Sequence, residues 1–531
     1  MIILHHAVPC GKKNNKYRHM KKKVLPLLIS LLSLHIAAQE KMNVLFILVD
    51  DLKPTIGAYG DNFAVTPNMD KLAEEGFVFQ NAYTQQAVCA PSRASMLTGL
   101  RPDVTKVRDL KTQIRSKNPN IVTLPQYFKQ NGYITHGIGK VFDPRSVDKK
   151  HDEPSWAIPY VGVFRLKWEQ PKPKNSYYQL LKNRIKVTHF EKLADEKALT
   201  GKKRNKYIYA AYKPSTEKAD VPDDAYIDGV IANAAIEKLD SFSKGGKPFM
   251  LMIGFKRPHL PFVAPTKYWN MYDAKKIKLA KYQKHAKNDT ELAYHNNGEL
   301  RSYTDIPDAF GSNGLLSDEK QKELIHGYYA ATSYVDAQIG KLLKKLKTTG
   351  LDKNTIIVLW GDHGWHLGDH GLWCKHTNLE QATRLPLIIN VPGNKPGKTR
   401  TPVESIDIFP TLCGLTGIVP SKELQGSSLI PLMEGQGKKQ TFAVSQWPIK
   451  AINGMGYTIR TERYRYTEWY ENYLSTKPRY LGDMVAAELY DYEKDPLETK
   501  NLVENKKYTD VVKEHKKLLH DFLDAQVVTK K

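Results

Sequence analysis

The residues best suited to chemistry stand directly after apolar runs of the sequence. One run ends in Asp50 and Asp51, and another ends in a Gly-Asp362-His363-Gly stretch. Adjacent carboxylates repel one another, so a pair at a strand end is costly unless a cation neutralises it. A solvated turn explains most Asp-Asp pairs, but a second acidic strand end favours a metal site. Oxygen-rich ligation favours a hard cation, Ca²⁺ or Mg²⁺, over zinc.

The second candidate is a cysteine followed closely by an arginine. Cys89 opens the stretch "CAPSRASMLTG", in which Pro91 suits the first turn of a helix and Ser92 can satisfy free N–H groups there. A helix amino end lowers the pKa of a thiol, and Arg93 offers a fixed fork for an oxyanion. A thiolate enzyme is the generic interpretation. It is disfavoured because no glycine-rich nucleophile turn surrounds Cys89 and because a thiolate does not need a metal-binding carboxylate pair.

Strands and helices must bring these residues together. Apolar runs without alternation, separated by helical stretches, predict a largely parallel α/β sheet covered on both faces. Ligands gather at the carboxyl edge of such sheets, so we expect distant segments to converge on one site. Helices are expected at 66–76, where Thr66 caps and Gly76 stops the helix, and at 326–346. The expected strands lie in the runs 43–51, 247–259, 354–364 and 385–393.

The composition divides the chain into three parts. Residues 1–38 hold lysines, an apolar run shorter than the ~20 residues of a membrane span, and then small residues, which is typical of a secretory signal beginning at Met20. We therefore predict export, to the periplasm or the medium, with no membrane span. Residues 39–440 form the predicted catalytic domain. Beyond 440, alternating aromatic and charged residues predict antiparallel strands and a terminal helix from about Asp510, so 441–531 forms an α+β subdomain.

The charge of the chain points to polyanionic partners. The formal net charge is +24, and the chain stays strongly basic without the predicted signal. An exported protein rarely meets nucleic acid, so a sulfated or uronic polysaccharide is the better candidate, and a merely soluble lysine-rich surface is the alternative. A row of lysines recurs every three residues between Lys275 and Lys287. On a helix at ~100° per residue this row slants, which favours a solvated helix face over a polysaccharide track.

Several motifs together resemble the type I sulfatases, which depend on formylglycine. "CAPSRASMLTG" matches the first sulfatase signature and "GYITHGIGK", residues 132–140, matches the second. The resemblance covers nearly the whole mature length, and within the family it is strongest to the iduronate-2-sulfatase branch. The stretches "GKVFDP", "FKRPHLPF", "GWHLGDHGLWCKHTN" and "RLPLIINVPG" carry that second likeness. The resemblance implies the alkaline-phosphatase-like fold, a large mostly parallel sheet flanked by helices with a smaller carboxyl-terminal domain.

The resemblance also implies that a maturation enzyme oxidises Cys89 to formylglycine (3-oxoalanine), an aldehyde. When hydrated, this aldehyde carries two hydroxyl groups, of which one attacks sulfur and expels the sugar oxygen. The second hydroxyl then loses its proton, rebuilds the aldehyde and releases sulfate. Three cysteines remain after signal removal, so at least one is unpaired or modified in an oxidising compartment. A modified Cys89 agrees with that odd number, and nothing in the sequence indicates that Cys374 and Cys413 pair.

The resemblance implies a role for each residue that matches a functional position of the family. Arg93 would stabilise the hydrate, Lys140 and Lys375 would neutralise sulfate oxygens, and His259 would protonate the leaving oxygen or donate a hydrogen bond to it. His376 lies in the substrate-facing segment. The metal, Ca²⁺ by family precedent and Mg²⁺ as second choice, would be held by five residues: Asp50, Asp51, Cys89, Asp362 and His363.

Two positions depart from the branch. Asp143 stands where the branch usually has a histidine, and His376 stands where it tends to have a tyrosine. An ionised carboxylate cannot donate a hydrogen bond, so a donor is expected elsewhere, with His136 and His366 as candidates. Both departures weaken the inference about the substrate more than the inference about the reaction.

We therefore expect an exported sulfatase acting on a sulfated carbohydrate. The preferred substrate is a 2-O-sulfated uronic acid at the end of heparan or dermatan sulfate, and a sulfated algal galactan of the carrageenan type is the alternative. A phosphodiester or phosphonate hydrolase of the same superfamily is a less favoured alternative, because such an enzyme would need no complete Cys-x-Pro-Ser-Arg signature. The alternative from another class is an inactive protein that binds sulfated glycans.

Overall fold

The computed structural model describes residues 41–163, 166, 177–307, 310, 315–437, 440–472 and 483–528. The predicted signal at 1–38 lies outside these ranges. The residues from Met42 to Lys531 belong to one compact unit. No helix in the described ranges combines the length and the apolar character that a membrane crossing requires.

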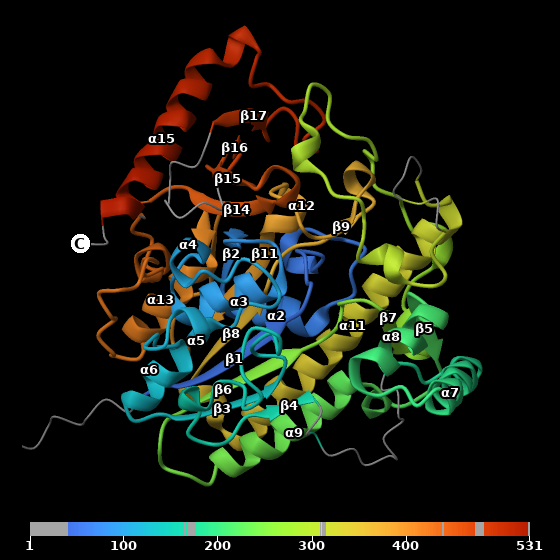
Figure 1. Cartoon of the computed structure of the whole chain (residues 1–531). Helices are drawn as coiled ribbons and strands as arrows, with labels where there is room; N and C mark the ends of the chain where they lie inside the picture. Colours follow the sequence, from blue (N-terminus) through green and yellow to red (C-terminus); the bar gives the residue numbers. More distant parts are fainter. Residues whose placement is uncertain are drawn as a thin grey trace, which may run out of the picture. The chain divides into compact units, whose positions relative to one another are not determined.

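A nine-stranded sheet runs through this unit (Figure 1). Its order is β12-β2-β11-β8-β1-β6-β3-β4, with β13 paired to β2. Only β11 runs against its neighbours among the described pairings of this sheet, so the predicted largely parallel sheet is confirmed. Along the chain the strands are β1 (Asn43–Val49), β2 (Phe77–Tyr83), β3 (Ile134–Gly139), β4 (Val161–Gly162), β6 (Phe249–Phe255), β8 (Thr355–Gly361), β11 (Arg384–Asn390), β12 (Gly397–Thr399) and β13 (Val403–Glu404).

Helices cover both faces of the sheet, because its central strands are apolar on both faces. Successive side chains of a strand point to opposite faces. Val44, Phe46 and Leu48 of β1 belong to one buried cluster, which includes residues of α3 (Cys89–Thr98), α6 (Leu124–Gln130) and α13 (Ile408–Leu415). The alternate residues of β1 belong to another, which includes residues of α2 (Pro67–Glu75), α9 (Ile227–Phe242) and α11 (Asp318–Thr349). This packing explains why the strand lacks polar alternation.

A second sheet begins at Ala443 within the same compact unit. It is antiparallel in the order β14-β15-β16-β17, and α15 (Thr509–Val528) packs on it. The terminal helix predicted from about Asp510 is confirmed, whereas a domain boundary at 440 stays a prediction. The strands are β14 (Ala443–Ile449), β15 (Gly454–Arg460), β16 (Tyr464–Tyr470) and β17 (Met484–Asp491).

Shorter elements join these parts. Two small sheets pair β5 (Thr216–Ala219) with β7 (Phe262–Pro265) and β9 (His366–Leu367) with β10 (Trp373–Cys374). The remaining helices are α4 (Pro102–Thr105), α5 (Ile114–Lys117), α7 (Leu181–Glu196), α8 (Gly201–Ala211), α10 (Thr266–Trp269), α12 (Glu380–Thr383) and α14 (Ile430–Met433).

Two expectations about helices need correction. The helix expected at 326–346 is longer, because α11 begins at Asp318, where Ser317 accepts a hydrogen bond from the backbone N–H of Lys320. The helix considered for the lysine row does not form. A single 3₁₀ turn, Ala274–Lys276, is followed by irregular backbone. Ile277 is buried in a hydrophobic cluster and Leu279 packs against it, so tertiary packing holds this segment.

Candidate active site

The register of two neighbouring strands brings the acidic strand ends together. In the parallel pair β1 and β8, Val49 lies opposite Gly361, so Asp50 and Asp51 emerge beside Asp362. The backbone N–H of Asp51 donates to Asp362 Oδ1 at 2.9 Å. All three carboxylates are buried. The predicted convergence at the sheet edge is therefore observed.

Five predicted residues meet at this edge. We call Asp50, Asp51, Cys89, Asp362 and His363 the carboxylate cluster. Two overlapping sets within the site bring their ligand atoms within 4.8 Å of one another, the first being Asp51, Cys89, Asp362 and His363. The second set contains Asp50, Asp51, Cys89 and His259. The donor atoms are three carboxylates, a sulfur and imidazole nitrogens, a composition able to hold a cation.

Cys89 is the first residue of α3, and its thiol faces the cluster. Its Sγ lies 3.6 Å from His363 Nε2 and 3.9 Å from Asp51 Oδ1. Burial, followed by the negative charge of Asp50, raises the pKa of this thiol well above its ordinary value. The prediction that the helix end lowers this pKa is wrong, because burial and the carboxylates outweigh the helix dipole. An unmodified Cys89 would therefore remain a neutral thiol.

Ser92 has a different partner from the one predicted. Its hydroxyl donates to the backbone carbonyl of Asp362, and α3 begins after Val88 with no side-chain cap. Ser92 therefore ties the helix to the end of β8.

Arg93 joins the two acidic strand ends. Its guanidinium donates to Asp362 Oδ2 and to Asp50 Oδ1, each at 2.9 Å, and also to the carbonyls of Lys140 and Val141. The side chain is completely buried. Its described hydrogen bonds go to these four acceptors, so Arg93 fixes the carboxylates that surround Cys89. The predicted contact with the formylglycine hydrate stays a prediction.

Lys140 reaches the cluster from the end of β3. Its Nζ lies 2.5 Å from Asp50 Oδ2, and its backbone N–H donates to the carbonyl of Gly254 at 2.7 Å. A Cβ atom at Gly254 would lie 2.0 Å from the carbonyl of Lys140. Only glycine at that position of β6 lets Lys140 approach so closely.

On the other side of the cluster, Lys375 bridges two carboxylates. Its Nζ lies 2.8 Å from Asp51 Oδ2 and 3.0 Å from Glu299 Oε1. Glu299 also lies 3.3 Å from His259 Nε2 and 3.8 Å from His376 Nε2. Sequence reasoning missed Glu299. It stands in an irregular segment just before a 3₁₀ turn, and neither a motif nor a strand end marks it.

The comparisons with known proteins agree with this geometry. The sulfatase family profile matches residues 42–418, and the profile of the N-sulphoglucosamine sulphohydrolase C-terminal region matches residues 368–525. The chain belongs to the sulfatase family. It is 33% identical to iduronate 2-sulfatase of Mus musculus over 91% of this chain and 93% of that protein. It is 32% identical to iduronate 2-sulfatase of Homo sapiens over 87% and 91%.

A solved structure confirms the fold of this sulfatase. The structure of BT1596, a 2-O GAG sulfatase, superposes with a TM-score of 0.62 at 23% identity and covers 92% of each chain. The alkaline-phosphatase-like α/β fold with its smaller carboxyl-terminal sheet is therefore confirmed. So is the assignment of the chain as a sulfuric ester hydrolase of the iduronate-2-sulfatase branch.

The donor set of this sulfatase fits a divalent cation. Although burial opposes ionisation, Lys140 and Arg93 hold the pKa of Asp50 well below its ordinary value. Burial raises the pKa of Asp51 well above its ordinary value, and the nearby charge of Asp50 adds to this although Lys375 opposes it. The positive charge near Asp51 is therefore too small to keep its carboxylate ionised easily. A bound hard cation would supply the missing positive charge.

His259 is positioned as a neutral ring. Burial, followed by the charge of Lys375, lowers the pKa of His259 well below its ordinary value. Its Nδ1 lies 2.6 Å from the carbonyl of Leu260, which can only accept, so Nδ1 carries the proton of the neutral ring. Nε2, which faces Glu299, is then an acceptor and must gain a proton before it can act as an acid.

Asp143 is compensated by cations and not by a histidine. Arg145 donates to both carboxylate oxygens at 2.9 and 2.8 Å, and Lys140 Nζ lies 3.9 Å away. The suggested substitutes have other partners: His136 faces the carbonyl of Ile158, and His366 faces the Thr377 hydroxyl. In this sulfatase, an Asp–Arg pair thus stands where the branch usually has a single histidine.

Proposed function

We propose that this sulfatase removes the 2-O-sulfate of a uronic acid residue at the end of a heparan or dermatan sulfate chain. The observation that carries this proposal is a cavity of about 260 Å³ beside the carboxylate cluster, lined by Lys140, Arg145, Lys256 and His259. Its volume is just below the usual range of ligand pockets, about 300–1,000 Å³, which suits one sugar residue. The likeness to two iduronate 2-sulfatases and to a 2-O GAG sulfatase supports the same substrate class.

Besides Lys140, the cavity is lined by two further cations, Arg145 and Lys256. Arg145 binds Asp143 through Nε and Nη2, so its Nη1 is the atom that would reach a substrate anion. Lys256 Nζ lies 3.2 Å from the Tyr177 hydroxyl and 4.5 Å from the centre of its ring. A uronic acid carries a carboxylate besides its sulfate, and these two cations would bind that second anionic group.

The proposed nucleophile and metal site rest on the likeness to the sulfatase family. A divalent cation would be held by five residues: Asp50, Asp51, Asp362, His363 and the modified Cys89. Ca²⁺ is the first choice for this cation and Mg²⁺ the second. Cys89, once oxidised to formylglycine by a maturation enzyme, would provide the nucleophile for sulfur, and a bound cation would lower the pKa of its hydroxyl group.

The remaining residues of the site bind sulfate and handle a proton. Lys140 and Lys375 lie on either side of the cluster, where their ammonium groups would neutralise sulfate oxygens as charge builds up on them. His259 Nε2 would carry a proton to the leaving sugar oxygen or donate a hydrogen bond to it. His376, whose Nε2 lies 3.8 Å from Glu299, would contact the substrate.

Sulfate release from a panel of defined disaccharides tests this substrate. We expect sulfate release from a disaccharide that carries a 2-O-sulfate on its uronic acid. We expect none from a disaccharide that carries sulfate only on its glucosamine. Arg145→Ala and Lys256→Ala should raise KM for the uronide, while a neutral sulfated sugar should be little affected. Release only from carrageenan-type galactans would replace the proposed substrate and leave the sulfatase assignment intact.

The mass of the tryptic peptide that contains Cys89 tests the nucleophile. In protein from a host with the maturation enzyme, we expect the mass of formylglycine. Thiol alone, together with retained glycan binding, would instead indicate the inactive glycan-binding protein. We also propose that the protein is exported, and amino-terminal sequencing of the mature protein should start near Gln39.

A further inference from the structure

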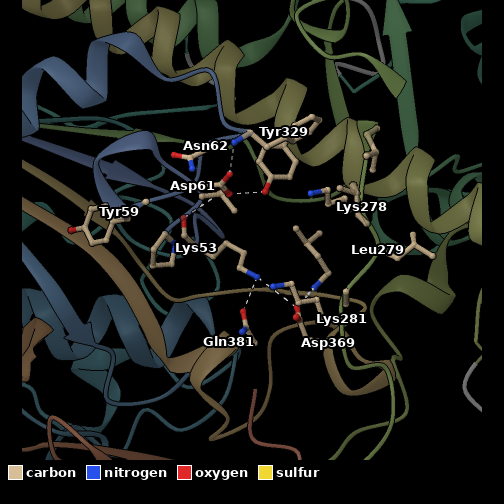
Figure 2. Close-up of a pocket in the computed structure, with 18 of the residues that line it drawn as sticks. Lys53, Tyr59, Asp61, Asn62, Lys278, Leu279, Lys281, Tyr329, Asp369 and Gln381 are labelled. Carbon is tan, nitrogen blue, oxygen red and sulfur yellow. Dashed lines mark hydrogen bonds and ion pairs between the residues drawn. The ribbon is translucent and has the colours of Figure 1, made fainter. Parts of the chain in front are cut away.

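A second cavity lies outside the carboxylate cluster and is lined by lysines. It has a volume of about 1010 Å³, near the upper end of ligand pockets. We call it the lysine groove. Its lining includes Lys275, Lys276, Lys278 and Lys281, which we call the lysine wall, together with Tyr59, Asp61 and Tyr329. Figure 2 shows Lys278 and Lys281 on the side of the pocket opposite Tyr59 and Asn62.

The four lysines of the lysine wall have no charged partner among the described residues. All four are exposed, and none of their ammonium groups forms a hydrogen bond or an ion pair with another residue that the structure describes. The acidic residues of the groove have partners of their own. Asp61 accepts from the Tyr329 hydroxyl at 2.6 Å, and Asp369 pairs with Lys53 at 3.7 Å. The groove is therefore a concave electropositive surface, which concentrates anions.

The lysine wall is fixed in place although its side chains are free. Ile277 is buried between the lysines, Asp273 accepts from the backbone N–H of Lys275, and the carbonyl of Tyr282 accepts from His370 at 2.9 Å. The Cα atoms of Lys275 and Lys278, and those of Lys278 and Lys281, lie at most about 10 Å apart, because three residues of extended chain span no more than that. Such a line of cations complements a linear chain with repeated anionic groups.

The groove shares its structural elements with the catalytic site. Lys53 follows Asp51 by two residues, and the Tyr328 hydroxyl joins them by accepting from the N–H of Lys53 and donating to the carbonyl of Asp51. The Lys53 ammonium donates to Gln381 at 2.7 Å, within the stretch of chain that also carries Lys375. A chain bound in the groove would thus stay next to the enzyme's active site.

We propose that the lysine groove is a second, non-catalytic binding site for an internal segment of a sulfated glycan chain. This inference rests on the proposed function, because it assumes that the substrate belongs to such a chain. Binding in the groove would hold the polymer near the carboxylate cluster and raise the local concentration of its ends. Small substrates would not need the groove.

The test compares long and short ligands. The triple variant Lys275→Gln/Lys278→Gln/Lys281→Gln should bind a sulfated heparan or dermatan oligosaccharide at least about tenfold more weakly at low salt, with a smaller salt dependence. Its rate on a 2-O-sulfated disaccharide should not change. The matched control replaces Lys344, Lys347 and Lys353, which are exposed and do not line the groove. Lys347 lies about 27 Å along α11 from Tyr329. The control should bind like the unmodified protein.

Three outcomes would overturn the inference. The first is unchanged oligosaccharide affinity in the triple variant, and the second is equal weakening in the control. The third is equally tight, groove-dependent binding of a nucleic acid oligomer of the same charge. Hydrogen exchange on the unmodified protein gives a second measurement, in which the oligosaccharide should protect residues 274–281. If the unmodified protein does not hydrolyse the disaccharide, the proposed function is contradicted. Binding of the oligosaccharide to the groove can still be measured in that case.

Discussion

The carboxylate cluster and the lysine groove are both rich in cationic side chains, but their cations have opposite surroundings. Arg93, Lys140 and Lys375 are buried, and each pairs with an aspartate. The four lysines of the lysine wall are exposed and have no charged partner in the part of the chain that the structure describes. A buried charge is tolerated only with a partner, which also fixes its position. An exposed charge remains hydrated and mobile, and it attracts anions over a distance. The comparison indicates that the cluster is built for geometry and the groove for attraction.

The largest expected effect follows from removing a buried cation. Arg93→Met would leave Asp50 and Asp362 without their guanidinium, so we expect a loss of about 3–5 kcal/mol in the free energy of unfolding. Denaturant unfolding measures it. Arg400→Ala is the matched control, because the Arg400 side chain is 69% exposed and its partner Glu462 is 58% exposed. That change should cost no more than about 1 kcal/mol. Equal losses in the two variants would contradict the distinction between buried, paired cations and exposed cations.

Lys375→Met should affect catalysis more than stability. Removing one preorganised cation from the developing charge should lower kcat/KM on a sulfated disaccharide about 10²-fold to 10³-fold. Lys53→Met is the control, since Lys53 lies close in sequence to Asp51 but pairs with Gln381 and Asp369. Its activity should stay within a few-fold of the unmodified enzyme. A similar loss in both would show that proximity to the cluster, and not the position of Lys375, matters.

Glu299→Gln tests the residue that the sequence did not reveal. Lys375 and His259 would lose a shared counter-charge and its orienting effect, so kcat should fall about 10-fold to 100-fold with a smaller change in KM. Glu291→Gln is a suitable control because its side chain is 84% exposed. A rise in KM alone would show that Glu299 binds the sugar and does not position Lys375.

The pocket tyrosine gives a pH-dependent readout. The charge of Lys256 lowers the pKa of Tyr177 to about 8, although burial opposes this. Above that pH the phenolate neutralises Lys256, so KM for an anionic substrate should rise. The phenolate–Lys256 pair also stabilises the folded state. This contribution to the free energy of unfolding is complete above the ordinary pKa of tyrosine and is lost as the pH falls through about 8. Ultraviolet titration measures the phenol, and Lys256→Met should move its ionisation to higher pH. An unshifted ionisation in that variant would contradict the assignment.

The smallest effect is expected from one groove lysine. Lys278→Gln should change the free energy of unfolding by less than about 0.5 kcal/mol, because the side chain is exposed and has no partner among the described residues. Affinity for a sulfated oligosaccharide should fall only a few-fold. Thermal unfolding and a binding isotherm at low salt measure the two quantities. A large loss of stability would mean that the lysine has a structural partner.

The sequence predicted the carboxylate cluster because strand ends obey a simple rule. Asp50 and Asp362 follow apolar runs, and parallel neighbouring strands end at the same edge of a sheet. Lys140, Lys375 and His259 were assigned by their motifs, and the structure places them around the same cluster. Their roles in the reaction stay predictions.

The rest depended on tertiary contacts that no local pattern records. Glu299 meets Lys375 from 76 positions away in the chain, and an irregular segment carries it. The Arg145 partner of Asp143 is close in sequence, but only burial shows that the pair is held in the site. The lysine row lacked helical periodicity. Its backbone conformation follows from the burial of Ile277, which local propensity does not reveal.

The long helix α11 constrains how the length of this chain can change. Tyr328 and Tyr329 are neighbours in sequence, but one hydroxyl reaches the Asp51 carbonyl and the other reaches Asp61 in the groove. One extra residue between Ser317 and Tyr328 would rotate both rings by about 100° and misplace both hydroxyls at once. Insertions and deletions in this helix should therefore be tolerated only beyond its packed portion, near Thr349.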